Sequence, residues 1–273
     1  MKFLSRSLVA FSTNRAGCAT GLKADGWFLM PEQLWFTAIL NHLFAGPVAA
    51  LLRMLSIAPK YPQAPIPNSL SMELLVFVFL IALFLLVRSR LSVDNPGGLQ
   101  HLFEAVDGFI KNQSNEIIGG HHNERYTPFL AALLYFILFC NLIGLVPGFE
   151  SPTALAVVPL GCAVCAFIYY QAQGFRHAGI GYLKHFAGPM PVLAPLMVPI
   201  EIISHLARVL SLTVRLYANM FAGDMVTLVF FSLIPLMLPI AFLGLHIFVS
   251  LLQTYIFVLL TTVYLQGAVG EEH

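Results

Sequence analysis

Long apolar segments separated by short polar ones dominate the pattern of this chain. They cover residues 70–87, 128–146, 153–170, 190–234 and 240–268. Each segment approaches or exceeds the roughly 20 residues that an α-helix needs to cross a bilayer, and none has the alternating pattern of a membrane β-strand. The pattern therefore predicts an all-α integral membrane protein with five transmembrane helices.

The fourth apolar segment is longer than a bilayer requires. As one straight α-helix, residues 190–234 would extend about 65 Å, roughly twice the ~30 Å thickness of the hydrocarbon region. The segment must therefore tilt steeply, bend, or consist of two helices. Prolines at both ends of residues 235–239 predict a turn between the last two segments.

An N-terminal extension, residues 1–68, precedes the membrane domain that we predict for residues 69–273. Residues 1–24 contain four basic residues and no acid, which is typical of a targeting segment; a start at Met30 is the alternative. Residues 31–57 are apolar but interrupted by polar residues and a proline, which favours an interfacial helix over a span. The Pro-rich residues 59–67 predict an extended linker.

Composition supports this class and offers little other chemistry. The chain is 58% hydrophobic and only 10% charged, which excludes an ordinary soluble domain. Cys162 and Cys165 form a CxxC in an apolar segment without a His or a second pair, so we expect packing rather than metal binding or redox chemistry. The His121-His122 pair also lacks further ligands. No metal, cofactor or nucleic-acid partner is expected.

Basic residues in the loops predict the orientation. The loops after the first and third spans contain all of them, and the alternate loops contain none. These basic residues are Arg88, Arg90, Lys111, Arg125, Arg176 and Lys184. The loops with basic residues should be cytoplasmic, which places the C-terminus inside and the N-terminus outside.

A stripe of polar residues runs along the fourth segment. Its members are three or four residues apart and fall within about 120° of one another on a helix: Glu201, Ser204, His205, Arg208, Ser211, Arg215 and Asn219. Asp224 lies about 140° from the angular position of Glu201 and Asn219. The last segment carries His246, Ser250 and Gln253 on one face. A proton path built from these groups would come in two parts.

Arg215 is the residue that most needs an explanation. Its guanidinium stays protonated, and an unpaired Arg at the centre of a span costs roughly 2.5 to 3.5 kcal/mol on insertion scales. Glu201 is about 21 Å away along a helix, and Asp224 is turned to another side. Neither acid can pair with Arg215 on a straight helix, so a partner outside this chain is expected.

The turn at residues 235–239 should return His246 to the level of Asp224, and Gln253 to a level between Asp224 and Arg215. Imidazole and a buried carboxylate can exchange protons near neutral pH. Other interpretations stay open: Ser204, Ser211 and Asn219 as packing contacts between helices, and Asn141 in the second span as a core amide or part of a water path. Glu201 and Arg208 could form a structural ion pair through His205.

Residues 215–224, with the sequence RLYANMFAGD, resemble the signature of the F-type ATP synthase a subunit. Three further segments support the resemblance: PIE at 199–201, NLIGLVP at 141–147 and LQTYIF at 252–257. The resemblance covers about residues 69–273, and the closing residues look bacterial. Gly144 stands where some bacterial members carry an acid, so the outer channel would depend more on Asp224 and His246.

The resemblance implies a stator subunit beside a rotating ring of c subunits, whose carboxylates meet Arg215 one after another. The last two segments would form a steeply tilted hairpin. The implied outer half-channel contains Asp224, His246, Asn141 and Gln253, and the inner one Glu201, Ser204 and His205. Arg208, Ser211 and Asn219 would support them.

The implied partners also include the b subunits of the peripheral stalk and membrane lipid, in a bacterial inner membrane; a mitochondrial inner membrane is the second choice. The chain has no P-loop, so ATP chemistry would take place elsewhere in the complex. The alternative is a secondary transporter that binds an anionic substrate through Arg215. It would require an inverted repeat with matching broken helices, and none is apparent.

Overall fold

The computed structural model describes residues 34–54, 65–92, 97–119, 125–146, 149–179, 194–233 and 238–269, and these contain helices and turns but no strand. Seven α-helices and one short 3-10 helix occur in these ranges. They are α2 (Trp35–Met54), α3 (Asn68–Ser89), α4 (Gly98–Ile118), α5 (Thr127–Ile143), η2 (Pro152–Ala154, 3-10), α6 (Val157–Ala178), α8 (Ala194–Leu233) and α9 (Leu238–Val269).

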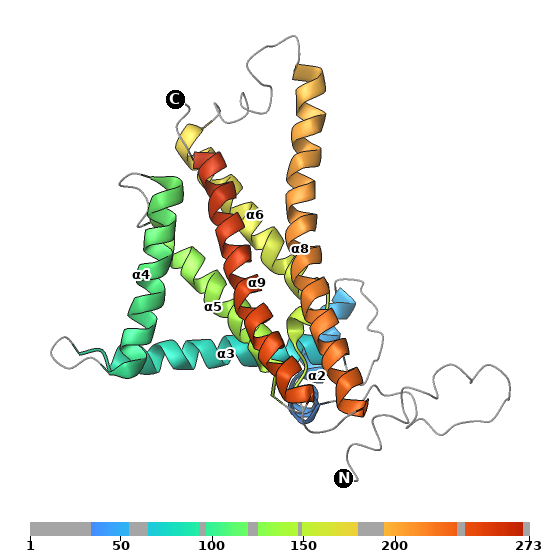
Figure 1. Cartoon of the computed structure of the whole chain (residues 1–273). Coiled ribbons are helices and arrows are strands. Elements are labelled where there is room, and N and C mark those ends of the chain that lie inside the picture. The colour runs from blue at the N-terminus through green and yellow to red at the C-terminus, as the bar shows by residue number, and fades with distance from the viewer. Residues whose placement is uncertain are drawn as a thin grey trace.

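Helices α8 and α9 form an antiparallel hairpin at the centre of the molecule (Figure 1). Helices α5 and α6 pack against α9, and α6 also packs against α8. Helix α3 contacts α5 and lies across the direction of α8 and α9 (Figure 1). If α3 crosses the membrane upright, α8 and α9 must therefore be steeply tilted in it.

Helix α8 resolves the three possibilities for the long fourth segment in favour of one continuous helix. It has 40 residues, which corresponds to about 60 Å. Pro199 is the sixth residue of the helix, where its missing N–H removes one backbone hydrogen bond, and the helix continues past it. The helix is too long to stand upright in a bilayer.

Four helices of the described residues are long and apolar enough to cross a membrane: α3, α6, α8 and α9. Helix α5 is apolar but has only 17 residues. Helix α2 confirms helical structure within residues 31–57, and it is not among the four candidates. Residues 1–33 and most of the predicted linker lie outside the described residues, as do His121-His122 and most of the turn at 235–239.

Helix α6 has other bounds at both ends than the predicted third span, residues 153–170. Residues 152–154 form the separate turn η2, so α6 begins at Val157 rather than at residue 153. The helix then continues past the apolar segment to Ala178, with Arg176 and His177 in its last turn, where cations interact favourably with the helix dipole. Gly179 follows with φ +57°, a positive φ that glycine adopts readily because it has no Cβ.

The other predicted bounds differ by fewer residues. Helix α5 ends at Ile143, three residues before the predicted end of the second span, because residues 144–146 leave the helix as a turn. Helices α3 and α9 extend one or two residues beyond the predicted first and last spans at each end. In α3 and α9, the backbone hydrogen bonding of the helix continues past the ends of the apolar run.

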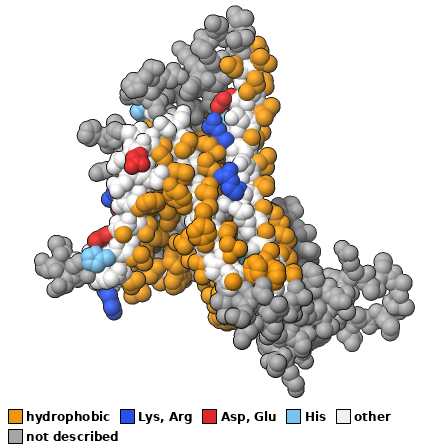
Figure 2. Space-filling view, in the orientation of Figure 1, with side chains coloured by type: hydrophobic (Ala, Val, Ile, Leu, Met, Phe, Trp, Pro, Cys, Tyr) orange, Lys and Arg blue, Asp and Glu red, His pale blue; other side chains and the backbone are white. Residues whose placement is uncertain are grey.

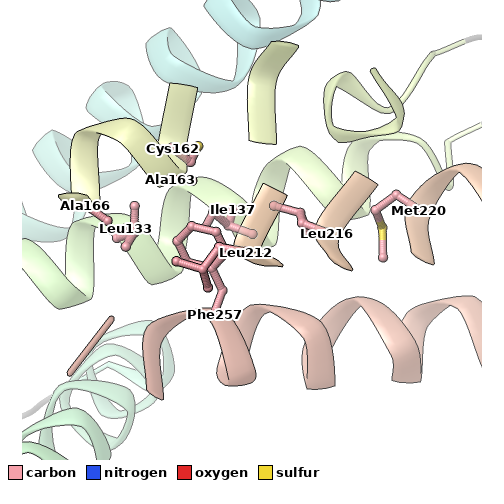
Figure 3. Packing of buried hydrophobic residues seen from close by; sticks show 9 residues of the cluster. All are labelled: Leu133, Ile137, Cys162, Ala163, Ala166, Leu212, Leu216, Met220 and Phe257. Carbon is pink, nitrogen blue, oxygen red and sulfur yellow. The ribbon is translucent and has the colours of Figure 1, made fainter. Parts of the chain in front are cut away.

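The main core lies where α5, α6, α8 and α9 meet (Figure 3). Phe257 of α9 is fully buried there, against small residues of α6, Ala163 and Ala166, and branched residues of α5 and α8. Small residues let membrane helices approach closely, and packing replaces the hydrophobic effect as their main attraction. Cys162 belongs to this core, in agreement with a packing role, and its thiol is free. The core holds the two helices of the hairpin in a fixed register.

Candidate functional site

The polar stripe lies along the border between the buried and the exposed sides of α8. Leu212, Leu216 and Met220 are buried in the core on one side. On the other side a row of apolar residues is exposed: Ile203 (65%), Leu206 (60%), Leu210 (59%) and Val214 (56%). Figure 2 shows charged side chains along this helix between rows of hydrophobic ones. The stripe is therefore accessible to a molecule that covers the exposed row.

Arg215 has one polar partner among the described residues. Its Nη2 donates a hydrogen bond to Ser211 Oγ at 3.3 Å, one helical turn away. No acid in the described part of the chain lies within ion-pair distance of the guanidinium. Glu201 and Asp224, the two acids of α8, each lie beside a histidine instead.

Towards the C-terminal end of α8, Asp224 faces His246 of α9. Asp224 Oδ1 lies 3.7 Å from His246 Nε2, and the imidazole is only 5% exposed. Gly223 makes this approach possible, because an added Cβ would lie 3.2 to 3.3 Å from atoms of the His246 ring. The hairpin thus brings these two residues to the same level, as the sequence predicted.

Glu150, in the connection before η2, adds a second acid to this end. It lies close enough to Asp224 for the two carboxylates to interact electrostatically. Desolvation by neighbouring helices raises the pKa of Glu150, and a hydrogen bond from Asn68 opposes that rise. The sequence placed Glu150 only in a loop between two spans and gave no sign that the loop folds towards Asp224.

Asn219 and Gln253 connect α8 and α9 between Arg215 and Asp224. Asn219 Nδ2 donates to Gln253 Oε1 at 2.8 Å. Gln253 is 1% exposed, and its Nε2 has no acceptor among the described residues. An unpaired buried donor is costly, about 1 to 3 kcal/mol, unless water or a further group meets it.

Asn141 of α5 is fully buried and hydrogen-bonded on both sides. Its Nδ2 donates to Thr254 Oγ1 at 3.2 Å, and its Oδ1 accepts from Thr153 Oγ1 at 2.7 Å. Thr153 in turn lies 2.9 Å from Ser151 Oγ. This network joins α5, η2 and α9. Sequence reasoning missed Ser151, Thr153 and Thr254, because single hydroxyls in apolar segments commonly bond to their own helix.

Gly144 lies directly against Ser151. A Cβ at position 144 would come within 2.6 Å of Ser151 Cβ and 3.1 Å of its Cα. An acidic side chain cannot occupy this position without moving the backbone of the turn. The space that an acid would need is filled by Ser151.

Towards the N-terminal end of α8, Glu201 and His205 form a second cluster with Tyr170 of α6. Glu201 Oε1 lies 3.3 Å from His205 Nε2, and Tyr170 Oη lies 3.3 Å from His205 Nδ1. Ser204 is half-exposed beside them. The sequence did not single out Tyr170.

Arg208 lies over the ring of Tyr264 of α9, with 5.1 Å from its Cζ to the ring centroid. Within the described residues it forms no ion pair with Glu201. The arrangement therefore gives no support to a structural pair between Glu201 and Arg208. A cation held over an aromatic face is stabilised without an acid.

Two polar clusters thus lie at opposite ends of one helix, with an unpaired cation between them. Glu201 and Asp224 are about 21 Å and 14 Å from Arg215 along α8. Among the described residues, no group of three potential ligands could hold a metal ion. A multi-pass helical membrane protein with this polar core belongs to the ion-translocating class.

Comparison with known proteins defines the family. Residues 70–266 match the ATP synthase A chain family. The chain is 56% identical over 245 residues to the ATP synthase subunit a of Koribacter versatilis, an alignment that covers 89% of this chain and all of the relative. It is 52% identical over 236 residues to that of Solibacter usitatus, covering 86% of this chain and all of the relative.

The subunit a of Geotalea uraniireducens is 40% identical over 205 residues, which cover 74% of this chain and 89% of the relative. The chain belongs to the family of ATP synthase a subunits, the proton-translocating stator subunits of F-type ATP synthases. Nothing in these comparisons favours a secondary transporter.

Proposed function

We propose that α8 and α9 form two offset half-channels against a ring of c subunits and that Arg215 separates them. Each c-subunit carboxylate stays ionised while it faces Arg215, then takes up a proton and rotates into lipid as a neutral acid. The observation that carries this proposal is the position of Arg215, between the two clusters and without an acid of its own.

The exposed row of α8 supports the ring as the partner. Leu206, Leu210 and Val214 are all more than half exposed and follow one another at single helical turns beside the stripe. A c-subunit helix would cover this row and bring its carboxylate to the guanidinium. A paired, desolvated Arg is far less costly in a membrane than a lone one.

The outer half-channel contains Asp224 and His246, with Asn141 and Gln253 nearby. The carboxylate and the imidazole are 3.7 Å apart, too far for a direct hydrogen bond, and His246 Nε2 has no hydrogen-bond partner among the described residues. One bridging water, or a small movement of either side chain, would let a proton pass between them. The unpaired Nε2 of Gln253 lies on the way from this pair to Arg215 and suits a path that contains water. Asn141 is hydrogen-bonded to Thr153, Thr254 and the carbonyl of Ser250 and supports the wall of this path.

The inner half-channel contains Glu201, Ser204 and His205, and it connects to the cytoplasm. Its carboxylate is partly exposed and its imidazole is buried, so a proton can enter at Glu201. Arg208, Ser211 and Asn219 support the stripe between the two half-channels. Ser211 orients Arg215 through the hydrogen bond at 3.3 Å.

Proton flow through these paths supplies the driving force for rotation. Each charge that crosses the membrane potential gains about 2.3 kcal/mol per 100 mV. The chain would have no catalytic site of its own and would work in a bacterial inner membrane with the c ring, the b subunits and the rest of the complex. Five spans, with α5 as the shortest, would keep its C-terminus in the cytoplasm.

Removal of the Arg215 charge tests this proposal. Arg215→Ala should abolish ATP-driven proton pumping in inverted membrane vesicles while the complex still assembles, because nothing then separates the half-channels or meets the carboxylate. The matched control is Arg88→Ala, which removes an exposed cation at the end of α3 and should leave pumping near the wild-type rate. Normal pumping by assembled Arg215→Ala complexes would refute the assigned role.

A further inference from the structure

The inner cluster continues beyond His205 into α6. Exposure falls along the cluster: the Glu201 side chain is 39% exposed and that of His205 9%, and Tyr170 as a residue is only 2% exposed. Both imidazole nitrogens have partners, Glu201 at Nε2 and Tyr170 at Nδ1, each at 3.3 Å. The imidazole therefore bridges a carboxylate on α8 and a phenol on α6.

Aromatic rings fix the position of this bridge. Tyr170 lies nearly parallel to the His205 ring, with centroids 6.2 Å apart, and Phe167 meets the imidazole edge-on at 5.9 Å. Tyr264 of α9 packs against Tyr170 at 6.1 Å and carries Arg208 on its ring. The polar stripe of α8 is thus anchored to α6 and α9 at this level.

Neutral imidazole carries a proton on one nitrogen and accepts at the other. A phenol that donates to Nδ1 selects the form with the proton on Nε2, which then points at Glu201. Hydrogen bonding to the second nitrogen is a general way to fix the orientation of a functional histidine.

We propose that Tyr170 is a positioning residue of the inner half-channel, whose O–H donates to His205 Nδ1 and holds the Nε2–H of the imidazole on the Glu201 carboxylate. This inference rests on the proposed function. The carboxylate is thereby kept in line with the stripe instead of rotating into solvent. Among the described residues, Glu201 and Tyr170 contact this imidazole, and Arg208 acts on it electrostatically.

Tyr170→Phe removes the hydroxyl and keeps the ring. In the whole ATP synthase in inverted vesicles, we expect ATP-driven pumping per assembled complex to fall about threefold to tenfold, the equivalent of one buried hydrogen bond. The dependence of pumping on the pH of the cytoplasmic side should also change, since the hydrogen bonding of a titratable group is altered. The matched control is Tyr169→Phe, because Tyr169 stacks on Phe129 at 3.7 Å and not on the cluster.

The effect of Tyr170→Phe should disappear in a His205→Ala background, since the hydroxyl acts through the imidazole. Wild-type rate and pH profile in Tyr170→Phe, or an undiminished loss in the double variant, would overturn the inference. The inference would also be overturned if Tyr170→Phe lowered the amount of assembled complex but left the pumping rate of each assembled complex unchanged. If Tyr170→Phe does not assemble, His205→Ala carries the test and should lower pumping per complex at least threefold to tenfold; a wild-type rate there overturns the inference. Normal pumping in Arg215→Ala would instead refute the proposed function itself.

Discussion

Arg215 differs from Glu201 and Asp224 on α8 because its side chain does not change its charge by losing a proton. Asp224 and Glu201 each face an imidazole, at 3.7 and 3.3 Å, and carboxyl and imidazole groups can each bind and release a proton. Arg215 faces only the Ser211 hydroxyl. A guanidinium stays charged at any working pH, so protons cannot pass through it. In the proposed mechanism, this difference keeps the two half-channels separate.

The role of Asp224 can be tested by replacing its carboxyl group with an amide of the same size, which cannot carry a proton in transit. Asp224→Asn should lower ATP-driven pumping by about tenfold or more; a direct proton-transfer group contributes 10²–10⁴-fold, but water can partly replace it here. Asp224→Glu keeps the carboxyl and should retain most of the activity. The measurement is fluorescence quenching in inverted vesicles, normalised to assembled complex. Equal rates in wild type and Asp224→Asn would contradict the assignment.

Part of the site follows from the sequence and part does not. The motif gave Arg215 and Asp224, and helical spacing with a short turn gave His246 and Gln253 at the right levels. Tyr170 and Thr153 could not be found this way, because their partners lie on other helices. Periodicity places a side chain on a face but does not say which helix covers that face.

At the scale of elements, the short helix η2 fixes the packing of α5 against α9. Its Thr153 bonds to Asn141, which bonds to Thr254 of α9. The apolar pattern assigned these residues to the start of a span, since a single 3-10 turn has no hydrophobic period of its own. The side-chain hydroxyls and the close contact with Gly144 keep the turn separate from α6.

Gly144→Ala tests this contact. The added Cβ meets backbone-bound atoms of Ser151 that cannot rotate away, so we expect a loss of about 1 to 3 kcal/mol in stability. The purified protein in detergent should unfold at a lower temperature. Gly161→Ala on α6 is the matched control, because nothing lies within 4 Å of its added Cβ. Equal unfolding temperatures for the two variants would show that Gly144 is not closely packed.

At the scale of the whole molecule, α8 and α9 lie across the direction of α3 (Figure 1). Sequence length alone left open whether the fourth segment tilts, bends or breaks, because apolar content does not record the angle of a helix. The packing of α5 and α6 against the hairpin settles its course as one long helix. Helix α8 has a long row of exposed apolar residues that a partner in the membrane can cover.

Cross-linking at this face tests the central claim, that Arg215 faces a carboxylate-bearing c subunit. In a chain whose four native cysteines are replaced, Val214→Cys places a thiol beside Arg215 at a position that is 56% exposed, and Leu212→Cys places one at a position that is 3% exposed. Within the assembled complex, Val214→Cys should cross-link to cysteines placed near the c-subunit carboxylate, and Leu212→Cys should not. A Val214→Cys thiol that cross-links only to a second copy of this chain, or as weakly as Leu212→Cys, would contradict the account.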